Sequence, residues 1–262
     1  MYPTLFHIFG VRVDTYSVMW FIALCLAIIW VIKRLEIYSL DEYESRRIMA
    51  VSFFCMMIGA IVFKNFRRIP RIFSDPSYIL TIRQWGVSEF GAVLGAFLSA
   101  FTMCMFSRKV SFAKLCDAAV PPAFLAIAIG RWGCFLNGCC VGLPTRFFTG
   151  VHFPFDRAEI FRHPVQIYYS VIAFLFIGVL LWTERRVIPL QQKKYYPVIA
   201  PLGIILYALM RFVIAPVRNW QSLLYMIPRY QYFATYSILA AALPFMLLWL
   251  AHSLYKLKSL SQ

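Results

Sequence analysis

GRWGCFLNGCCVG, the stretch from Gly130 to Gly142, follows directly on an apolar run that covers residues 118–129. Arg131 would lie deep beside that run, where a charged side chain costs about 2.5–3.5 kcal/mol on membrane-insertion scales. Such an arginine persists where it meets an anion, a carboxylate or a water-filled cavity. Four glycines in the stretch let the backbone turn sharply or approach another group closely. The stretch therefore predicts the floor of a polar pocket inside a membrane protein.

The composition is that of a helical membrane protein. Of 262 residues, 61% are hydrophobic and 14% are charged, whereas a soluble domain carries about 25% charged residues. The apolar blocks run continuously over roughly 18–20 residues, the length of a membrane-spanning helix. A transmembrane β-barrel would instead alternate apolar and polar residues. The expected fold class is all-α.

Seven spans can be placed, and we expect residues 1–262 to form a single integral membrane domain. The expected spans cover residues 15–32, 48–63, 87–106, 115–133, 164–182, 196–215 and 233–251. Residues 1–14 are expected to lie in the membrane interface. Pro121 and Pro122 are expected to kink or interrupt the fourth span. In the third span, Gly91 and Gly95 have the spacing of close helix packing.

The net charge of +15 comes from 26 Lys and Arg against 11 Asp and Glu. Most of these cations flank apolar blocks, where they meet anionic lipid headgroups, so the charge does not indicate a nucleic-acid partner. Lys and Arg are slightly more numerous on the side of the C-terminus, which favours a cytoplasmic C-terminus and a periplasmic N-terminus. The loop of residues 64–83 departs from this bias, and it either contacts headgroups or holds an anionic lipid.

Four polar side chains are expected at one level of the bundle, because the ends of their spans face the same side. They are Tyr16, Arg131, His163 and Arg211. On composition alone, Tyr16 fits an interfacial anchor better than a hydroxyl of the pocket. Two guanidinium groups suit a phosphate diester, which they can pair with through two parallel hydrogen bonds. The pattern predicts a site for an anionic phospholipid headgroup. The arginines could instead form ion pairs, with Glu89 as the main candidate partner.

Two further features of the predicted site leave alternatives open. His163 precedes Pro164 and is either a base or a helix-start residue. Asn137 could share a helix face with Arg131 and donate a hydrogen bond to an oxygen of the ligand. The cluster of Cys134, Cys139 and Cys140 admits three interpretations, namely reactive thiols, ligands of a soft metal, or small residues at a tight packing point. No residue has the usual spacing of a further metal ligand, so no metal and no cofactor are expected.

The sequence resembles the prolipoprotein diacylglyceryl transferases over nearly its whole length. The matching motifs are Tyr16, Asp75-Pro76, Trp85-Gly86-Val87-Ser88, Gly91 and Gly95, Asp117 and Pro121, Gly130 to Gly142, Arg162-His163-Pro164-x-Gln166-x-Tyr168, Tyr207-x-x-x-Arg211 and Arg218. The resemblance implies transfer of diacylglycerol from phosphatidylglycerol to the lipobox cysteine thiol of a prolipoprotein. It also implies a multi-pass protein of the bacterial inner membrane whose N-terminus faces the periplasm.

The sequence departs from the family pattern at several polar positions. The family's His-Gly-Gly is Phe90-Gly91-Ala92 here, so its histidine is absent. Asparagine and glutamate of the central motif are replaced by Cys134 and Cys139. Other polar positions are occupied by Met57, Tyr169 and Ala215. The anion-binding framework is kept, whereas most of the groups that would handle protons are lost.

The hypothesis that follows is a membrane transferase that moves a diacylglyceryl group to a thiol. Its catalytic residues are expected to be Arg131, Arg211, Tyr16, Asn137, Cys134 and Cys139. Its substrate-binding residues are expected to be Arg131, Arg211, His163, Gln166, Tyr168, Glu89, Gly91 and Gly142. The expected partners are phosphatidylglycerol, the signal peptide of a prolipoprotein or another thiol acceptor, and the membrane. The alternatives are a paralogue with another acceptor and a non-catalytic lipid-binding protein.

Overall fold

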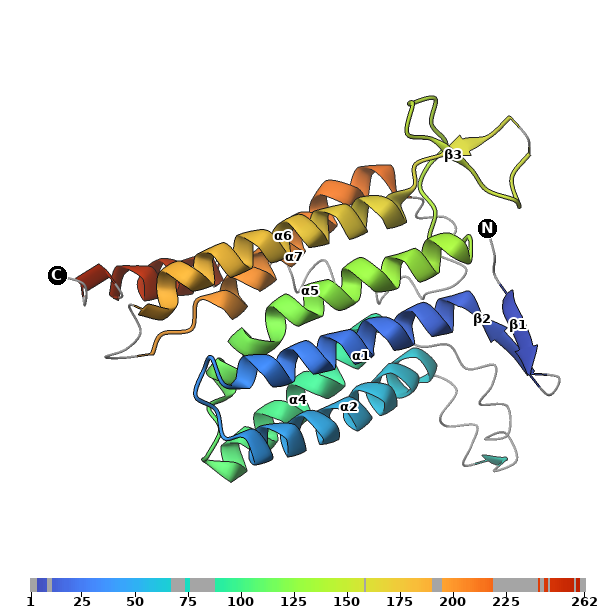
Figure 1. Cartoon of the computed structure of the whole chain (residues 1–262). Coiled ribbons are helices and arrows are strands. Elements are labelled where there is room, and N and C mark those ends of the chain that lie inside the picture. The colour runs from blue at the N-terminus through green and yellow to red at the C-terminus, as the bar shows by residue number, and fades with distance from the viewer. Residues whose placement is uncertain are drawn as a thin grey trace.

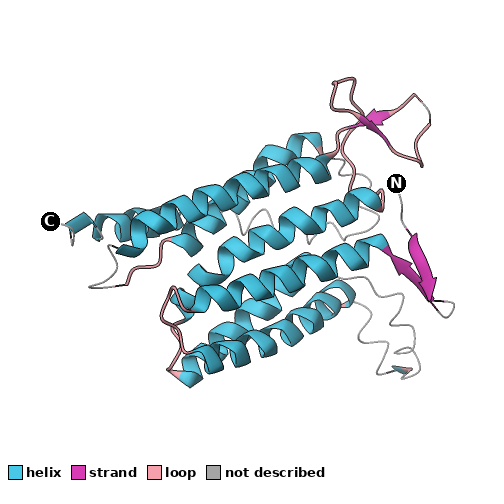
Figure 2. Cartoon of the chain, viewed as in Figure 1, coloured by secondary structure: helices cyan, strands magenta, loops and turns pink. Residues whose placement is uncertain are grey.

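The computed structural model describes residues 4–8, 11–66, 74–75, 88–157, 159–189, 195–218, 240, 243–244, 246–256 and 258–259. These residues form mainly long helices that run side by side (Figures 1 and 2). The helices are α1 (Thr15–Leu35), α2 (Glu42–Asn65), α4 (Glu89–Ser107), α5 (Phe112–Leu136), α6 (Val165–Val187) and α7 (Ile199–Ile214), followed by the short 3-10 helix η3 (Ala215–Val217).

Six of the expected spans correspond to helices that are long and apolar enough to cross a membrane. The protein is therefore a multi-pass membrane protein. Helices α1, α2, α5 and α6 extend beyond the predicted limits, whereas α7 lies within its predicted span. For example, α2 begins at Glu42, and the Asp41 side chain caps it by accepting a hydrogen bond from the Glu44 amide. The seventh expected span, residues 233–251, lies largely outside the described residues.

Two small hairpins lie at the end of the bundle where α1 begins and α5 ends (Figure 1). Strands β1 (Thr4–Ile8) and β2 (Val11–Asp14) pair antiparallel within the segment expected only to lie in the interface. Strands β3 (Val151–His152) and β4 (Phe161–Arg162) pair antiparallel in the connection between α5 and α6. The described structure is thus helical with two short two-stranded sheets.

Glycines bring α2 and α4 into backbone contact. A Cβ atom added to Gly91 would overlap the carbonyl oxygen of Gly59, and one added to Gly95 would overlap that of Cys55. The predicted close packing at Gly91 and Gly95 is confirmed, with α2 as the partner helix. Small residues allow such approaches in membranes because the apolar lipid gives helices little other reason to associate.

Helix α5 is the centre of the bundle, since it packs against α1, α6 and α7. Its glycines face α1, because a Cβ on Gly130 would lie 2.8 Å from the Trp20 ring and one on Gly133 would lie 2.9 Å from Met19 Cβ. On its other side, α5 contributes to a core shared with α6 and α7. The buried members of that core are Phe124, Ala128, Val165, Tyr169, Ala173, Leu180, Ile199, Leu206, Met210 and Ile214.

The expected interruption at Pro121 and Pro122 does not occur, because α5 continues through both residues. Each proline lacks an amide hydrogen, which leaves the carbonyl four residues earlier without its helical donor. Those carbonyls belong to Asp117 and Ala118. Arg34, at the end of α1, donates to both, from Nε to Ala118 O at 2.8 Å and from Nη2 to Asp117 O at 3.5 Å. The arginine therefore replaces the two missing donors.

Arg34 belongs to a buried polar network at the end of the bundle opposite the hairpins. Its guanidinium forms a salt bridge with Glu184 of α6, and the Tyr38 hydroxyl donates to the same carboxylate. Nearby, the Asp117 carboxylate accepts hydrogen bonds from the Val198 and Ala200 amides at the start of α7. An acid at a helix N-terminus satisfies amides that have no partner within the helix.

A first prediction concerns the contact between α2 and α4. Gly95→Leu should lower the midpoint of thermal unfolding of the detergent-solubilised protein, since overpacking costs about 1–3 kcal/mol. Gly178→Leu is the matched control, because nothing lies within 4 Å of a Cβ at that position. Equal midpoints for the two variants would contradict the close backbone approach.

A second prediction concerns the carbonyls of Asp117 and Ala118, which the two prolines leave without helical donors. Arg34→Met removes their donors and leaves Glu184 buried without its cation, so we expect a loss of about 3–5 kcal/mol. Thermal unfolding followed by tryptophan fluorescence measures the effect. Arg185→Met, at an exposed position of α6, should leave the midpoint unchanged, and an Arg34→Met protein as stable as this control would refute the role given to Arg34.

Candidate functional site

The predicted site residues come from helix ends that meet at one end of the bundle. They lie at the starts of α1, α4 and α6 and at the ends of α5 and α7, on the side where the two hairpins lie (Figure 1). The expected common level of Tyr16, Arg131, His163 and Arg211 agrees with this arrangement.

Glu89 lies between the two arginines of the predicted pair. Its Oε2 atom is 3.7 Å from Arg131 Nη2 and 3.8 Å from Arg211 Nη1. The arginine side chains are 8% and 5% exposed, whereas that of Glu89 is 52% exposed. The ion-pair alternative raised by the sequence is thus present. Both contacts are long, so neither guanidinium is fixed in the close, two-bond geometry of a strong carboxylate pair.

Aromatic residues orient these charges. Arg131 Cζ lies 4.4 Å from the centre of the Tyr169 ring, a favourable cation–π arrangement. The other face of the site is formed by Tyr207, whose hydroxyl donates to Glu89 at 2.9 Å and whose ring lies 5.9 Å from Arg211 Cζ. Both tyrosines therefore position guanidinium groups.

Arg218 adds a third cation. Its Nη1 donates to the Tyr169 hydroxyl at 3.3 Å, and its Cζ lies 5.8 Å from that ring. Its backbone is held by a bridge to Gly142, next to the Leu143 amide that bonds to Val217 O at 2.8 Å. The loop after α5 and the chain after η3 are thereby joined beside the site.

The site carries an excess of positive charge. Arg131, Arg211 and Arg218 are all buried, and Glu89 is the only acid among the described residues that pairs with any of them. In addition, Arg131 Nε is buried without a hydrogen-bond acceptor among the described residues. A buried donor without an acceptor is costly. The arrangement is therefore suited to bind a further anion whose oxygens reach the guanidinium groups.

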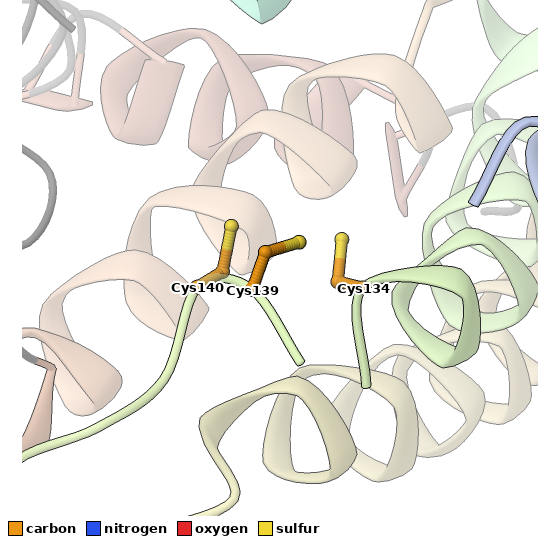
Figure 3. A group of neighbouring side chains, drawn as sticks. All are labelled: Cys134, Cys139 and Cys140. Atoms are coloured by element: carbon orange, nitrogen blue, oxygen red, sulfur yellow. The ribbon is translucent and has the colours of Figure 1, made fainter. Parts of the chain in front are cut away.

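The backbone after Arg131 ends α5 in a Schellman motif. Gly138 has a φ of +71°, its amide bonds to Phe135 O, and the Cys139 amide bonds to Cys134 O. This pairing brings the side chains of Cys134 and Cys139 together. Cys140, with a φ of +60°, follows directly. The three sulfur atoms lie within 4.8 Å of one another, and Figure 3 shows Cys139 pointing toward Cys134 with Cys140 beside it.

None of the three cysteines forms a disulfide bond with another described residue, and the surroundings of Cys140 favour its thiolate. Hydrogen bonds from Cys134 and Cys139 lower the pKa of the Cys140 thiol below its ordinary value, and Arg131 and Arg218 act in the same direction, although burial opposes them. Asn137 is within hydrogen-bond reach of Cys139, so it belongs to this cluster.

Tyr16 lies at the start of α1 against the same part of α5. A Cβ on Gly133 would lie 3.3 Å from Tyr16 Cα, and the Tyr16 hydroxyl interacts electrostatically with the three cysteines and Arg131. The tyrosine thus borders the cysteine cluster, as well as the arginine, on the α1 side.

The remaining predicted residues organise the loop. His163 Nδ1 is 3.2 Å from the Tyr168 hydroxyl, which also contacts Thr149 at 2.7 Å. Gln166 donates to Cys139 O, while its Oε1 is buried without a partner among the described residues. Gly142 donates to His163 O at 3.0 Å.

Gly91 was expected to bind substrate, and the structure places it at the contact with α2 described above. Its position explains the glycine through helix packing, and its substrate contact stays a prediction. Three residues of the site were not among those predicted from the sequence, namely Tyr169, Tyr207 and Arg218. Tyr207 and Arg218 already stood in the matching motifs, whereas Tyr169 stood only as a departure from them.

The fold and the site define a multi-pass membrane protein with buried arginines gathered at one end of its helix bundle. The model of the family described as prolipoprotein diacylglyceryl transferase matches residues 3–250. The chain belongs to this family.

Three relatives carry the corresponding enzyme name. The phosphatidylglycerol–prolipoprotein diacylglyceryl transferase of Clostridium tetani (strain Massachusetts / E88) is 32% identical over 189 residues, which cover 71% of this chain and 75% of the relative. The enzyme of the same name from Clostridium novyi (strain NT) is 30% identical over 229 residues, which cover 84% of this chain and 85% of the relative. The phosphatidylglycerol–prolipoprotein diacylglyceryl transferase 2 of Clostridium perfringens (strain 13 / Type A) is 28% identical over 218 residues, which cover 81% of this chain and 82% of the relative.

A third prediction tests the role of Tyr169. Tyr169→Leu removes the ring beneath two guanidinium groups, and the loss of a cation–π contact worth about 0.5–2 kcal/mol should weaken binding of a soluble, short-chain anionic phospholipid about 2- to 30-fold. Tyr169→Phe keeps the ring and should bind within about threefold of the unchanged protein. Titrations followed by tryptophan fluorescence give both affinities. Unchanged affinity in Tyr169→Leu would contradict the aromatic support.

Proposed function

We propose that this protein is a phosphatidylglycerol–prolipoprotein diacylglyceryl transferase. The observation that carries the proposal is the convergence of Arg131, Arg211 and Arg218 on one buried site, where Glu89 is the one acid among the described residues that pairs with Arg131 and Arg211. The family and the names of the relatives supply the reaction. The site supplies a reason why an anionic phospholipid binds there.

The chemistry requires stabilisation of a growing negative charge. The acceptor thiolate forms a bond from sulfur to the terminal glyceryl carbon, and the bond from that carbon to the phosphate oxygen breaks. The phosphate diester carries one negative charge, whereas the departing glycerol phosphate carries two. Guanidinium groups already in place beside the phosphate stabilise the second charge, and such a contribution is worth about 10²- to 10³-fold in rate for one donor.

The half-exposed Glu89 suggests a role at the entrance to the site. Its contacts of 3.7 and 3.8 Å are long enough for a phosphate to replace them as the closer partner of both guanidinium groups. Tyr207 would keep the carboxylate in place by its hydrogen bond. Glu89 thus holds the arginines apart and oriented until the lipid arrives.

The proposed function also implies where the protein lies and how it is oriented. We place the protein in the bacterial inner membrane, with seven spans and with the site end toward the periplasm. In that orientation the N-terminus is periplasmic and the C-terminus cytoplasmic. The donor lipid and the signal peptide of the prolipoprotein would both reach the arginines from the surrounding membrane.

A fourth prediction tests the proposal with purified protein, phosphatidylglycerol and a synthetic peptide that carries a lipobox cysteine. Arg131→Gln and Arg211→Gln should each lower kcat for release of glycerol phosphate about 10²- to 10³-fold, because the departing phosphate loses a cation. Arg185→Gln, an exposed arginine at the other end of the bundle, is the matched control.

Two outcomes would overturn the proposal. Full rates in both arginine variants would remove the role of the site in transfer. Binding of phosphatidylglycerol by the unchanged protein without any lipidated peptide would indicate a lipid-binding protein instead.

A further inference from the structure

The cysteine cluster has the arrangement of an incomplete metal site. Its three sulfur atoms lie within 4.8 Å of one another. Zinc binds thiolate sulfur at about 2.3 Å in a tetrahedron, which separates neighbouring sulfurs by about 3.8 Å. The side chains therefore need to close by no more than about 1 Å, a change within the reach of small rotations about the Cα–Cβ bonds.

The backbone fixes these three positions. The Schellman motif ties Cys139 to Cys134 through the hydrogen bond to Cys134 O, and Gln166 holds Cys139 O from α6. A Schellman motif ordinarily carries a hydrophobic contact between these two positions. Here both positions are cysteines, and the left-handed Cys140 adds a third sulfur to the same group.

The charges around the cluster suit an anionic metal centre. Three thiolates and one Zn²⁺ carry a net charge of −1. Arg131 and Arg218 both interact electrostatically with Cys140, so they would stabilise that charge. A zinc ion held by three protein ligands keeps its fourth position open, as catalytic zinc sites do.

The cysteine cluster lies beside the arginines where the proposed reaction needs a thiolate. Arg131 contacts Glu89 on one side and interacts with Cys140 on the other, so the cluster adjoins the anion site. Glu89 is a poor candidate to accept the thiol proton, since its carboxylate faces two guanidinium groups and already accepts a hydrogen bond from the Tyr207 hydroxyl. A thiol that coordinates a metal ion, in contrast, is deprotonated outright.

We propose that Cys134, Cys139 and Cys140 hold a Zn²⁺ ion whose fourth position binds the acceptor thiol as a thiolate. This inference rests on the proposed function. When the thiol binds, its proton leaves to solvent. The sulfur then attacks the glyceryl carbon, the bond to the phosphate oxygen breaks, and the neutral thioether product leaves the metal. Zinc remains Zn²⁺ throughout, so no electrons are exchanged.

The experiment replaces zinc by Co²⁺, whose thiolate complexes absorb through sulfur-to-metal charge transfer. The full-length protein is purified under reducing conditions and titrated with Co²⁺. We expect one equivalent to produce the absorption and Zn²⁺ to displace it. Cys134→Ser, Cys139→Ser and Cys140→Ser should each weaken Co²⁺ binding at least tenfold, whereas Cys25→Ser, in α1, should not.

A second titration tests the open position. A lipobox peptide should increase the charge-transfer absorption of the cobalt protein by adding a fourth thiolate, and the same peptide with serine in place of its cysteine should leave the absorption unchanged. Equal spectra with the two peptides would overturn the acceptor role. If Cys134→Ser does not fold, as judged by size-exclusion profile and thermal unfolding, the two loop variants decide the result.

The zinc site and the transferase function can fail independently, and the experiments distinguish the two failures. Diacylglyceryl transfer by a protein that takes up no cobalt, and that stays active after treatment with a chelator, would overturn the zinc site and leave the function intact. Stoichiometric cobalt binding that responds to the cysteine peptide, without transfer from phosphatidylglycerol, would support the site and contradict the function.

Discussion

The balance of one carboxylate against buried guanidinium groups determines how the site end of this protein is built. Glu89 comes from the first turn of α4, Arg131 from the last turns of α5 and Arg211 from the end of α7. Each charge would be expensive alone in an apolar bundle, so the three helix ends have to meet. The surplus of positive charge remains after they have met, and under the proposed function it binds the anionic phospholipid.

At the opposite end of the bundle, Arg34 compensates for hydrogen bonds that the prolines of α5 cannot form. Pro121 and Pro122 remove two hydrogen bonds from the helix that carries Arg131, and Arg34 restores donors to both carbonyls while Glu184 balances its charge. The central helix therefore continues without interruption to the site. Glycines at 130 and 133 then allow α1 to approach closely enough for Tyr16 to border the cysteine cluster.

Much of this was predictable from the sequence because membrane spans and buried charges leave strong signals. Six spans, the packing role of Gly91 and Gly95 and the shared level of Arg131 and Arg211 are confirmed. The continuity of α5 was not predictable, since it depends on Arg34, which is distant in sequence. Tyr169 escaped notice for a similar reason, because an aromatic residue in an apolar helix has no signal that it faces arginines. The seventh span and the orientation of the termini stay predictions.

The central claim is that the arginine site directs diacylglyceryl transfer to a cysteine. For the most direct measurement, this chain is expressed in a bacterium depleted of its own diacylglyceryl transferase. The mass of the N-terminal peptide of a reporter lipoprotein is then determined. We expect a diacylglyceryl group on the lipobox cysteine and a requirement for Arg131. An unmodified cysteine, with the protein present in the membrane at the normal level, would contradict it.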